Sequence, residues 1–355
     1  MNYLIFRNDG IGDLIVSTDA IQRIRTNDKN AKITLICSRR NYQYAKILKR
    51  EKYIHDLINL DKIDSIKSFF LLIKKLRKIG FFQAYILKVD NKNLLISLLS
   101  RSKYINTLLP NKLSKFNNKL TYKYPLLISR YLFYKYEIIN TTKIKSSDTK
   151  TMMGSHISNL ISKSLKSKNK SLNYIIPKSV NISQIKNKFS FLNINTKKII
   201  LIHIDEKWHD HEGNVSHLIS IINILKNKSV GNYLLVITNG VLFTRINKSL
   251  IQYFSNDKTT NADNFSTDFN NKKNIYFLKK TNIEELMCLS KCSSLIIHMH
   301  GALTHISSIY QTPIIDIIPN NSKEYFNKWR PNFKKYIQIE IKEIGKIKKL
   351  ISNLI

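Results

Sequence analysis

Short apolar runs alternate with longer segments whose apolar residues recur at helical spacing, and this alternation extends along most of the chain. Residues 3–6 (YLIF) are typical of a strand, and a glycine turn leads from them into a helix-like segment. Residues 64–79 show the helical spacing most clearly, with Asp64 or Ser65 as the cap and Gly80 as the stop. The rhythm predicts an α/β fold with parallel sheets covered by helices on both faces.

The same pattern predicts two series of elements. Strands are expected at residues 33–37, 57–60, 84–88, 198–204, 233–238, 275–278, 295–297 and 314–318, and helices at residues 14–24, 41–49, 64–79, 215–226, 243–254, 283–292 and 302–310. Residues 261–273 are polar and are expected to form a loop. The two series predict two Rossmann-like halves that face each other across a cleft.

The domain boundaries follow from where the pattern weakens. Residues 143–170 are rich in Ser, Thr, Asn and Lys and are expected to form a connection or a loosely packed helical region. We therefore expect a first domain at 1–165 and a second at 175–335. The apolar and basic segment 340–355 is expected to be a helix that packs back on the first domain.

The chain carries 59 Lys and Arg against 24 Asp and Glu, a formal net charge of +35. Such a field favours polyanions: nucleic acid, an anionic membrane surface or a phosphorylated glycan. Lys, Asn and Ile are abundant everywhere, so an AT-rich genome is an alternative source of the charge. No helix-turn-helix, RNP-type strand or zinc-finger spacing indicates a specific nucleic-acid partner. An anionic membrane surface and an acidic substrate remain the better candidates for what this positive charge binds.

One segment is a candidate for membrane contact. Residues 125–140 (PLLISRYLFYKYEIIN) are aromatic and basic, and they predict either a helix lying on an anionic bilayer or an ordinary core-facing helix with snorkelling cations. No apolar run reaches the ~18 residues of a membrane span. With no signal peptide visible, we expect a cytoplasmic protein, with any membrane contact peripheral and at the inner face of the inner membrane.

Candidate chemistry begins in the first turn, Arg7-Asn8-Asp9-Gly10-Ile11-Gly12-Asp13. Asp13 is expected at the mouth of the first helix, above the carboxyl end of the first strand, where open α/β sheets bind ligands. There it could take a proton from a bound hydroxyl. A dinucleotide site is disfavoured, because Ile15 stands where the third glycine of the fingerprint belongs.

Two clusters follow strands of the second half, His203 to His211 and His298 to His305. The helix after Gly301 would direct its free N–H groups at an anion, and Lys207 could neutralise a diphosphate. The same clusters also permit a metal site, formed by the histidine pairs 209/211 and 298/300 with Asp205 and Asp210. H-x-H spacing is common, so this alternative is the weaker one.

Together these pieces resemble glycosyltransferase family 9, the lipopolysaccharide heptosyltransferase family. Residues 10–15 (GIGDLI) look like the family's opening "iGDvl" motif, residues 206–208 (EKW) are similar to its "K-x-W-P" segment, and residues 301–315 look like its "D-[ST]-G-x-x-H…P-v-v" segment. The three occur in the family's order, from about Phe6 to Pro319.

The resemblance implies a GT-B fold and an inverting, metal-independent transfer from a nucleotide-diphosphate sugar, with no cofactor. It makes Asp13 the general base. It implies donor binding by Lys207, His203, Gly301, Thr304 and His305. It implies acceptor binding by Asn8, Gly12, Arg39 and Arg40. The implied donor is similar to ADP-heptose, and the implied acceptor is an anionic glycolipid or glycan such as the lipopolysaccharide core.

The chain departs from the family where the donor sugar is held. The acidic residue of "D-[ST]-G" is replaced by His300 or Met299, and His209 stands where a proline follows Trp208. The resemblance therefore implies a divergent branch with its own sugar or acceptor. Two alternatives stay open: a non-catalytic polyanion-binding protein on a transferase scaffold, and a metal-dependent hydrolase using the histidines.

Overall fold

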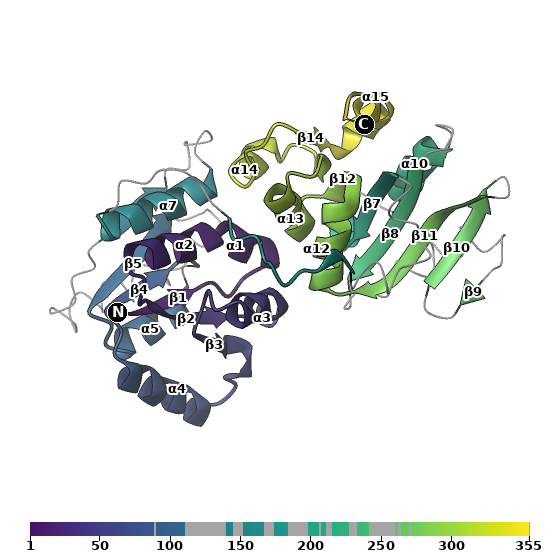
Figure 1. Ribbon diagram of the computed structural model, residues 1–355. Coiled ribbons are helices and arrows are strands. Elements are labelled where there is room, and N and C mark those ends of the chain that lie inside the picture. Colours follow the sequence, from purple (N-terminus) through teal and green to yellow (C-terminus); the bar gives the residue numbers. More distant parts are fainter. Residues whose placement is uncertain are drawn as a thin grey trace. The chain divides into compact units, whose positions relative to one another are not determined.

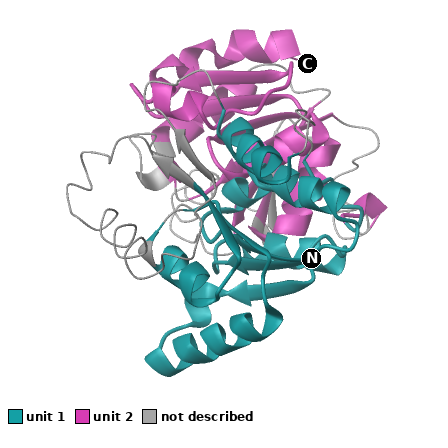
Figure 2. Ribbon diagram, turned by 90° about the vertical axis from the view of Figure 1, so that its left-hand side faces the viewer, with its two compact units in different colours: residues 1–179 teal, residues 180–355 magenta. Residues whose placement is uncertain are grey.

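The computed structural model of the chain divides into two compact units, Met1–Ser179 (unit 1) and Val180–Ile355 (unit 2) (Figures 1 and 2). It describes residues 1–88, 90–110, 140–144, 152–166, 174–183, 198–205, 207–210, 215–226, 233–240, 260–261, 264–269 and 272–354.

The sheet of unit 1 is entirely parallel, as the sequence predicts, with the order β3-β2-β1-β4-β5-β6. Its strands are β1 (Asn2–Phe6), β2 (Lys32–Cys37), β3 (Asp56–Asn59), β4 (Gln83–Ile86), β5 (Tyr104–Pro110) and β6 (Asn140–Ile144). This is the doubly wound order, in which the chain leaves β1 first toward one edge and later, from β4 on, toward the other.

Helices cover both faces of this sheet. They are α1 (Ile11–Val16), α2 (Thr18–Asn27), α3 (Tyr42–Arg50), α4 (Ile66–Ile79), α5 (Asn91–Leu99) and α7 (Met153–Ser164), with a short 3₁₀ turn at Leu60–Lys62. Figure 1 shows α1, α2 and α7 on one side of the sheet and α4 and α5 on the other. Strands β1, β2 and β4 are almost wholly buried, and most of their residues are apolar on both faces rather than alternating.

The caps of α4 are those that the sequence predicts. The Ser65 hydroxyl accepts a hydrogen bond from the Ser68 N–H at 3.1 Å, which satisfies one of the free donors of the first turn. Gly80 ends the helix with φ of 65°, a conformation that favours glycine. Only Leu72, Ile73 and Leu76 of α4 are buried against the sheet.

The sheet of unit 2 has the order β14-β13-β12-β7-β8-β11-β10-β9. Its strands are β7 (Lys198–Ile204), β8 (Tyr233–Gly240), β9 (Thr260–Asn261), β10 (Asn264–Phe269), β11 (Lys272–Thr281), β12 (Ser293–Met299), β13 (Ile314–Ile318) and β14 (Tyr336–Glu340). Strands β7, β8 and β11 to β14 are parallel and repeat the order of unit 1, starting from β7.

The polar segment 261–273 is not the loop that its composition predicts. It holds β10, which pairs antiparallel with β11 and with β9 at the edge of the sheet. β10 is second from the edge, between β11 and the two-residue strand β9, so backbone pairing rather than composition decides its conformation.

The helices of unit 2 are α9 (Lys207–Asp210), α10 (Val215–Lys226), α12 (Ile283–Cys292), α13 (Ala302–Tyr310), α14 (Lys323–Asn327) and α15 (Ile347–Leu354), with a 3₁₀ segment at Ile341–Lys346. In the last helix, Ile347 and Ile351 are buried in the core of unit 2 with Leu218 and Ile222 of α10, so the apolar stripe of α15 packs within its own unit. The expected contact of this helix with the first domain stays a prediction.

The boundary between the units lies at Ser179/Val180. Part of the expected connection is well packed, because Ile157, Leu160 and Ile161 of α7 are fully buried. The chain stays in unit 1 beyond α7, where the Ile175 N–H donates to the Thr18 hydroxyl at 3.1 Å.

Two expected segments lie outside the described residues: the helix at 243–254, and the candidate membrane segment 125–140 up to its last residue. None of the helices in the described ranges is both long and apolar enough to cross a bilayer.

A buried ion pair links α2 to α7 in unit 1. Arg23 Nε lies 2.6 Å from Asp19 Oδ2, and Arg23 Nη1 donates to the Ser162 hydroxyl. Because Asp19 is 1% exposed, Asp19→Ala would leave a buried guanidinium without its carboxylate, and we expect the free energy of unfolding to fall by about 3–5 kcal/mol. Urea denaturation measures this loss. The double variant Asp19→Leu/Arg23→Met should recover most of it, and a single variant as stable as the double one would contradict the prediction.

Candidate functional site

In both sheets the strand order reverses beside the first strand, so β1 lies next to β4 and β7 next to β12. The register pairs Phe6 with Ile86 and Ile202 with Ile297. The residues that follow these pairs therefore emerge side by side at the carboxyl edge of each sheet. The two connections leave toward opposite faces there, which opens the crevice where α/β proteins bind ligands.

In unit 1 this position is organised by Arg7, which is 2% exposed. Its Nη1 donates to the Leu87 carbonyl after β4 at 2.8 Å, and its Nε donates to the Asp13 carbonyl in α1 at 3.0 Å. One buried guanidinium thus fixes the turn after β1, the first helix and the turn after β4 relative to one another.

Two carboxylates share that guanidinium. Asp13 Oδ1 lies 3.3 Å from Nη2, and Asp9 Oδ2 lies 3.2 Å from Nη1. Asp13 Oδ2 also accepts the Gly10 N–H at 3.1 Å, and a Cβ on Gly10 would stand 3.0 Å from that oxygen. Glycine is needed there for close approach. With 28% of its side chain exposed, Asp13 is a fixed yet accessible carboxylate.

The pKa of Asp9 is raised to about 6, because burial disfavours its charged form and the Asp13 charge adds to this, while Arg7 opposes both. Asp9 Oδ1 is buried and has no hydrogen-bond partner among the described residues. Asp9 was not among the residues predicted from the sequence. It is the third residue after an apolar strand, but only the shared guanidinium reveals its coupling to Asp13.

The predicted acceptor residues of unit 1 lie at the same edge but in different settings. Asn8 exchanges amide hydrogen bonds with Asn93 of α5, at 2.7 and 3.2 Å. Gly12 is buried inside α1. Arg39 and Arg40 follow β2 and are exposed. Asn93, which the sequence analysis did not single out, thus joins the turn after β1 to the helix after β4.

The loop that carries Arg39 and Arg40 is fixed to the turn of Arg7. The Asn41 amide donates to the Arg7 carbonyl at 2.6 Å, and the Ser38 hydroxyl donates to the Asp9 carbonyl at 2.9 Å. The two exposed cations therefore stand on a loop whose base is anchored to the Arg7–Asp9 turn.

In unit 2, Lys207 and Asp205 follow β7 and meet the end of β12. The Lys207 ammonium donates to the His300 carbonyl, and Asp205 Oδ1 accepts the Lys207 N–H at 3.1 Å. A Cβ on Gly301 would lie 3.1 Å from Asp205 Oδ2 and 3.2 Å from Lys207 Nζ. The φ of Gly301 is −175°, which any residue adopts, so a side chain here would be opposed by crowding against these neighbours and not by its backbone conformation.

Trp208 anchors Lys207 from the other side. Its side chain is 1% exposed, and its indole N–H donates to the His203 carbonyl at 3.0 Å. The Lys-Trp pair of the sequence motif is thereby explained: the tryptophan enters the core, and the lysine before it stays at the carboxyl edge.

His203 and His298 lie beneath this edge as neutral rings. Burial lowers the pKa of His203 to about 4, and its Nδ1 pairs with the Thr238 hydroxyl at 2.8 Å. Burial, and next the His203 ring, hold the pKa of His298 well below its ordinary value. His298 Nδ1 donates to the His203 carbonyl at 3.0 Å. His298 Nε2 is buried without a hydrogen-bond partner among the described residues, 3.5 Å from Asp205 Oδ2.

The start of α13 is held by Asp316, a carboxylate in the middle of the buried strand β13. Thr304 donates to Asp316 Oδ1 at 2.8 Å, while His300 Nδ1 and Tyr336 OH contact Oδ2 at 2.6 and 2.5 Å. Burial alone would raise the pKa of Asp316, but His300 and these hydrogen bonds hold it below its ordinary value. Asp316 was not predicted as a site residue, although a lone acidic residue within the apolar strand Ile-Ile-Asp-Ile-Ile is a signal that the sequence carries.

This network gives the predicted donor residues different places. Thr304 is fully buried, and its hydroxyl is already used by the Gly301 N–H and by Asp316. His300 lies with its ring 4.7 Å from that of Phe326 and 5.6 Å from that of His305, which is 4% exposed. Lys207 is thus the partly exposed member of the set, and Gly301, Thr304 and His305 are buried.

The metal alternative gains no support from the described residues, which hold no group of three or more His, Cys, Asp or Glu arranged for a metal ion. The side chains of residues 209–211 lie outside that part of the chain.

Solved structures with the same architecture include a glycosyl transferase family 9 protein from Veillonella parvula, at 13% identity and a TM-score of 0.69, covering 99% of this chain and 95% of that one. The ADP-heptose lipopolysaccharide heptosyltransferase II of E. coli matches at 12% identity and a TM-score of 0.67, covering 100% and 98%. The chain has the GT-B fold. A UDP-GlcNAc 2-epimerase from Methanocaldococcus jannaschii shares it less closely, at 14% identity and a TM-score of 0.55, covering 100% and 92%. Neither a protein-family profile nor a curated protein matches the sequence.

The raised pKa of Asp9 makes the stability of unit 1 depend on pH. A carboxyl group that binds its proton more tightly when folded stabilises the protein fully below the unfolded pKa of about 3.8, and loses that contribution as pH rises through about 6. We therefore expect the wild type to lose about 2 kcal/mol relative to Asp9→Asn across this window. Urea denaturation at several pH values tests it. In the exposed control Asp64→Asn, the free energy of unfolding should change with pH as it does in the wild type. The same change with pH in the wild type and in Asp9→Asn would contradict the prediction.

Proposed function

We propose that the chain is a divergent member of glycosyltransferase family 9 that transfers a sugar, with inversion and without a metal, from a nucleotide-diphosphate sugar to an acceptor hydroxyl. The observation that carries this proposal is the complementary chemistry of the two reversal points. Unit 1 places the fixed carboxylate of Asp13 there, and unit 2 places the ammonium of Lys207 at the start of α13. Displacement at an anomeric carbon requires both a base for the attacking hydroxyl and a positive group for the departing diphosphate.

On the acceptor side, Asp13 would take the proton of the attacking hydroxyl. Arg7 and the Gly10 N–H each occupy one oxygen of Asp13, which fixes the carboxylate while leaving lone pairs for a substrate. The exposed Arg39 and Arg40 would meet phosphates or carboxylates of an anionic glycolipid or glycan. This assignment requires that Asp13 and Lys207 act on the same pair of substrates.

On the donor side, Lys207 and the first N–H groups of α13 would neutralise the charge that develops on the diphosphate. The buried Nε2 of His298 supports a ligand at this place, because its unmet hydrogen-bonding capacity lies beside Lys207 and Gly301. Neutral His203 and His298 would keep the floor of the site uncharged, so that Lys207 supplies the local positive charge.

The donor that we propose is similar to ADP-heptose, the sugar nucleotide named for the E. coli structure. The proposed acceptor is the lipopolysaccharide core or another surface glycan, reached at the inner face of the membrane by a cytoplasmic protein in peripheral contact with it. Met299 or His300 stands where the family motif has an acidic residue, and His300 is bound to Asp316. Neither a thioether nor an imidazole offers the sugar the hydrogen bonds of a free carboxylate, so we expect the donor sugar to differ from the family's usual one.

Asp13→Asn keeps the size of the side chain and removes the base, so we expect kcat to fall by about 10²–10⁴-fold while donor binding is retained. Transfer of radiolabelled sugar measures the first effect, and thermal stabilisation by the donor measures the second. Asp64→Asn, an exposed carboxylate before α4, is the matched control. Turnover of Asp13→Asn close to that of the wild type would remove Asp13 from the mechanism.

Lys207→Met should weaken the binding of nucleoside diphosphates by about 10–100-fold, since hydrogen bonds to charged groups contribute about 1.5–3 kcal/mol. Thermal shift with a panel of nucleoside diphosphates and their sugars measures the loss of affinity and identifies the nucleobase of the donor. Lys198→Met, at the opposite end of β7, should bind as the wild type does. Equal affinity in the two variants would overturn the donor assignment, and conversion of a donor sugar without an acceptor would favour an epimerase instead.

A further inference from the structure

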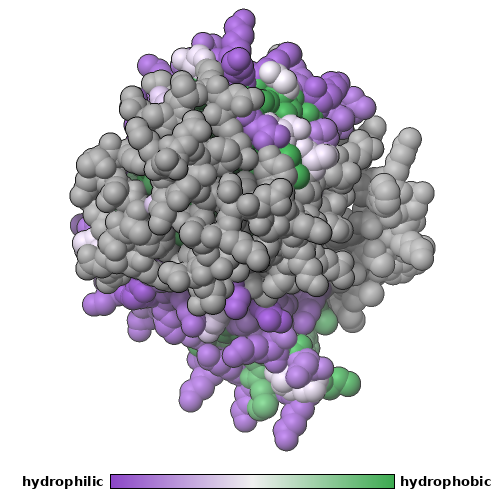
Figure 3. Space-filling model, turned by 90° about the vertical axis from the view of Figure 1, so that its right-hand side faces the viewer, coloured by the Kyte–Doolittle hydropathy of each residue, from purple (hydrophilic) through white to green (hydrophobic). Residues whose placement is uncertain are grey.

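Helix α4 exposes large apolar side chains that its own packing does not need. Ile66, Phe70 and Leu71 are 78%, 62% and 58% exposed, while the helix is held on the sheet by Leu72, Ile73 and Leu76. Figure 3 shows hydrophobic surface beside hydrophilic surface at the lower end of the molecule, where α4 lies. Single exposed apolar residues are common in soluble proteins, but a group of them on one helix indicates a contact surface.

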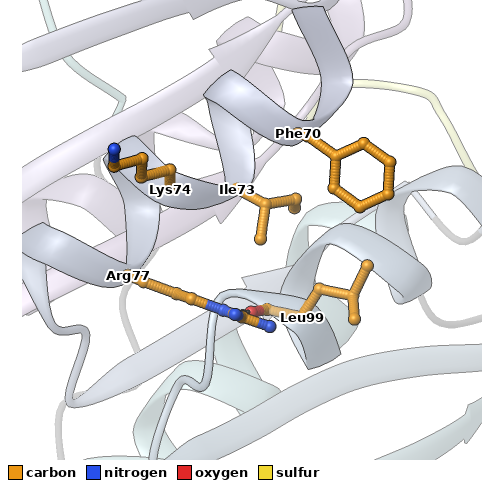
Figure 4. A pocket seen from close by; sticks show the side chains of 5 residues that line it. All are labelled: Phe70, Ile73, Lys74, Arg77 and Leu99. Carbon is orange, nitrogen blue, oxygen red and sulfur yellow. Dashed lines mark hydrogen bonds between the residues drawn. The ribbon is translucent and has the colours of Figure 1, made fainter. Parts of the chain in front are cut away.

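A hollow adjoins this group. Phe70 and Ile73 of α4 and Leu99 of α5 form the apolar walls of a cavity of 290 Å³, and Lys74 and Arg77 lie along its other side (Figure 4). Arg77 is fixed there, because its Nε donates to the Leu99 carbonyl at 2.7 Å. Apolar walls beside two cations are suited to an amphiphile with a negative headgroup.

The charge of α4 has one sign. The helix contains five cations, Lys67, Lys74, Lys75, Arg77 and Lys78, and no carboxylate. Lys75 is paired with Asp56 at 2.9 Å. Lys67, Lys74 and Lys78 are exposed, and none of them contacts a carboxylate within the described part of the chain.

We infer that the exposed face of α4, together with the adjoining cavity, is the surface by which this protein docks on an anionic phospholipid bilayer. Exposed Phe, Leu and Ile would enter the headgroup region while the lysines meet phosphates, as in amphipathic helices that lie in the plane of a membrane. The acidic surface of a protein partner would satisfy the lysines but leave the apolar group and the cavity unused. The inference rests on the proposed function for its purpose, access to a lipid-linked acceptor, whereas the contact itself rests on α4.

Sedimentation with vesicles tests the contact. The full chain should bind vesicles of phosphatidylcholine with phosphatidylglycerol, and bind vesicles of phosphatidylcholine alone far more weakly. Phe70→Ser/Leu71→Ser should reduce binding by about tenfold or more, given what burying such side chains contributes. Lys67→Glu/Lys74→Glu/Lys78→Glu should reduce it by more than about 100-fold, since each surface lysine contributes about fivefold on an anionic bilayer.

The matched control is Lys29→Glu/Lys32→Glu/Lys52→Glu, which makes the same change of net charge at exposed positions elsewhere in unit 1. It should retain most of the binding. An equal loss in both triple variants would mean that net charge alone attracts the protein, and would overturn the assignment to α4. Failure of the wild-type protein to bind anionic vesicles would overturn the assignment as well.

Failure of this inference is separable from failure of the proposed function. The α4 variants should show the wild-type thermal shift with a nucleoside diphosphate and unchanged transfer to a water-soluble acceptor, which also proves that they fold. If the wild type transfers sugar but does not bind vesicles, only the docking surface is contradicted. If it binds vesicles but transfers no sugar, only the proposed glycosyltransferase function is contradicted.

Discussion

The reversal of strand order beside β1 and beside β7 is the constraint on which the rest of the molecule depends. A parallel sheet directs all its strands the same way, so every strand delivers its following residues to one edge. Where the order reverses, two successive connections leave toward opposite faces, and the backbone between them stays uncovered. Both units use this place for their charged residues: Arg7 and Asp13 in unit 1, and Asp205 and Lys207 in unit 2. The strand order thus determines where in each unit the charged residues gather, whatever the individual contacts between them.

A buried charge then fixes each reversal point. In unit 1 it is the guanidinium of Arg7, which bonds to both flanking loops and carries two carboxylates. In unit 2 it is the carboxylate of Asp316, which accepts from His300, Thr304 and Tyr336. Burying a charge is costly unless its partners surround it, so each arrangement specifies one geometry for the loops around it. Of the accessible groups, Asp13 is held directly by Arg7, and Lys207 donates to the carbonyl of His300, whose ring bonds to Asp316.

The pattern of apolar residues was sufficient for most elements. Several predicted strands and helices have the bounds found in the structure: 198–204, 215–226, 283–292, 302–310 and 314–318. Buried parallel strands are recognised by short, continuous apolar runs, and helices packed on one side by longer segments with an apolar residue every three to four positions. The prediction of a loop at residues 261–273 was wrong, because hydrophobic periodicity carries little information in a polar segment. Residues 264–269 are largely polar and still form a strand, since pairing with β11 and β9 decides their conformation.

The order of residues was enough to predict the fold class, the parallel sheets and the positions of Asp13, Lys207 and Gly301 after their strands. These are local properties, fixed by spacing along the chain. Which groups share a charge or a hydrogen bond depends on packing in three dimensions. Asp9 and Asp13 meet on Arg7, and Asp316 of β13 reaches His300 at the end of the neighbouring strand β12, because side-chain contacts depend on strand pairing and register, which spacing along the chain does not give. Burial, which sets the pKa of Asp9 and keeps His203 neutral, is likewise a property of the packed molecule.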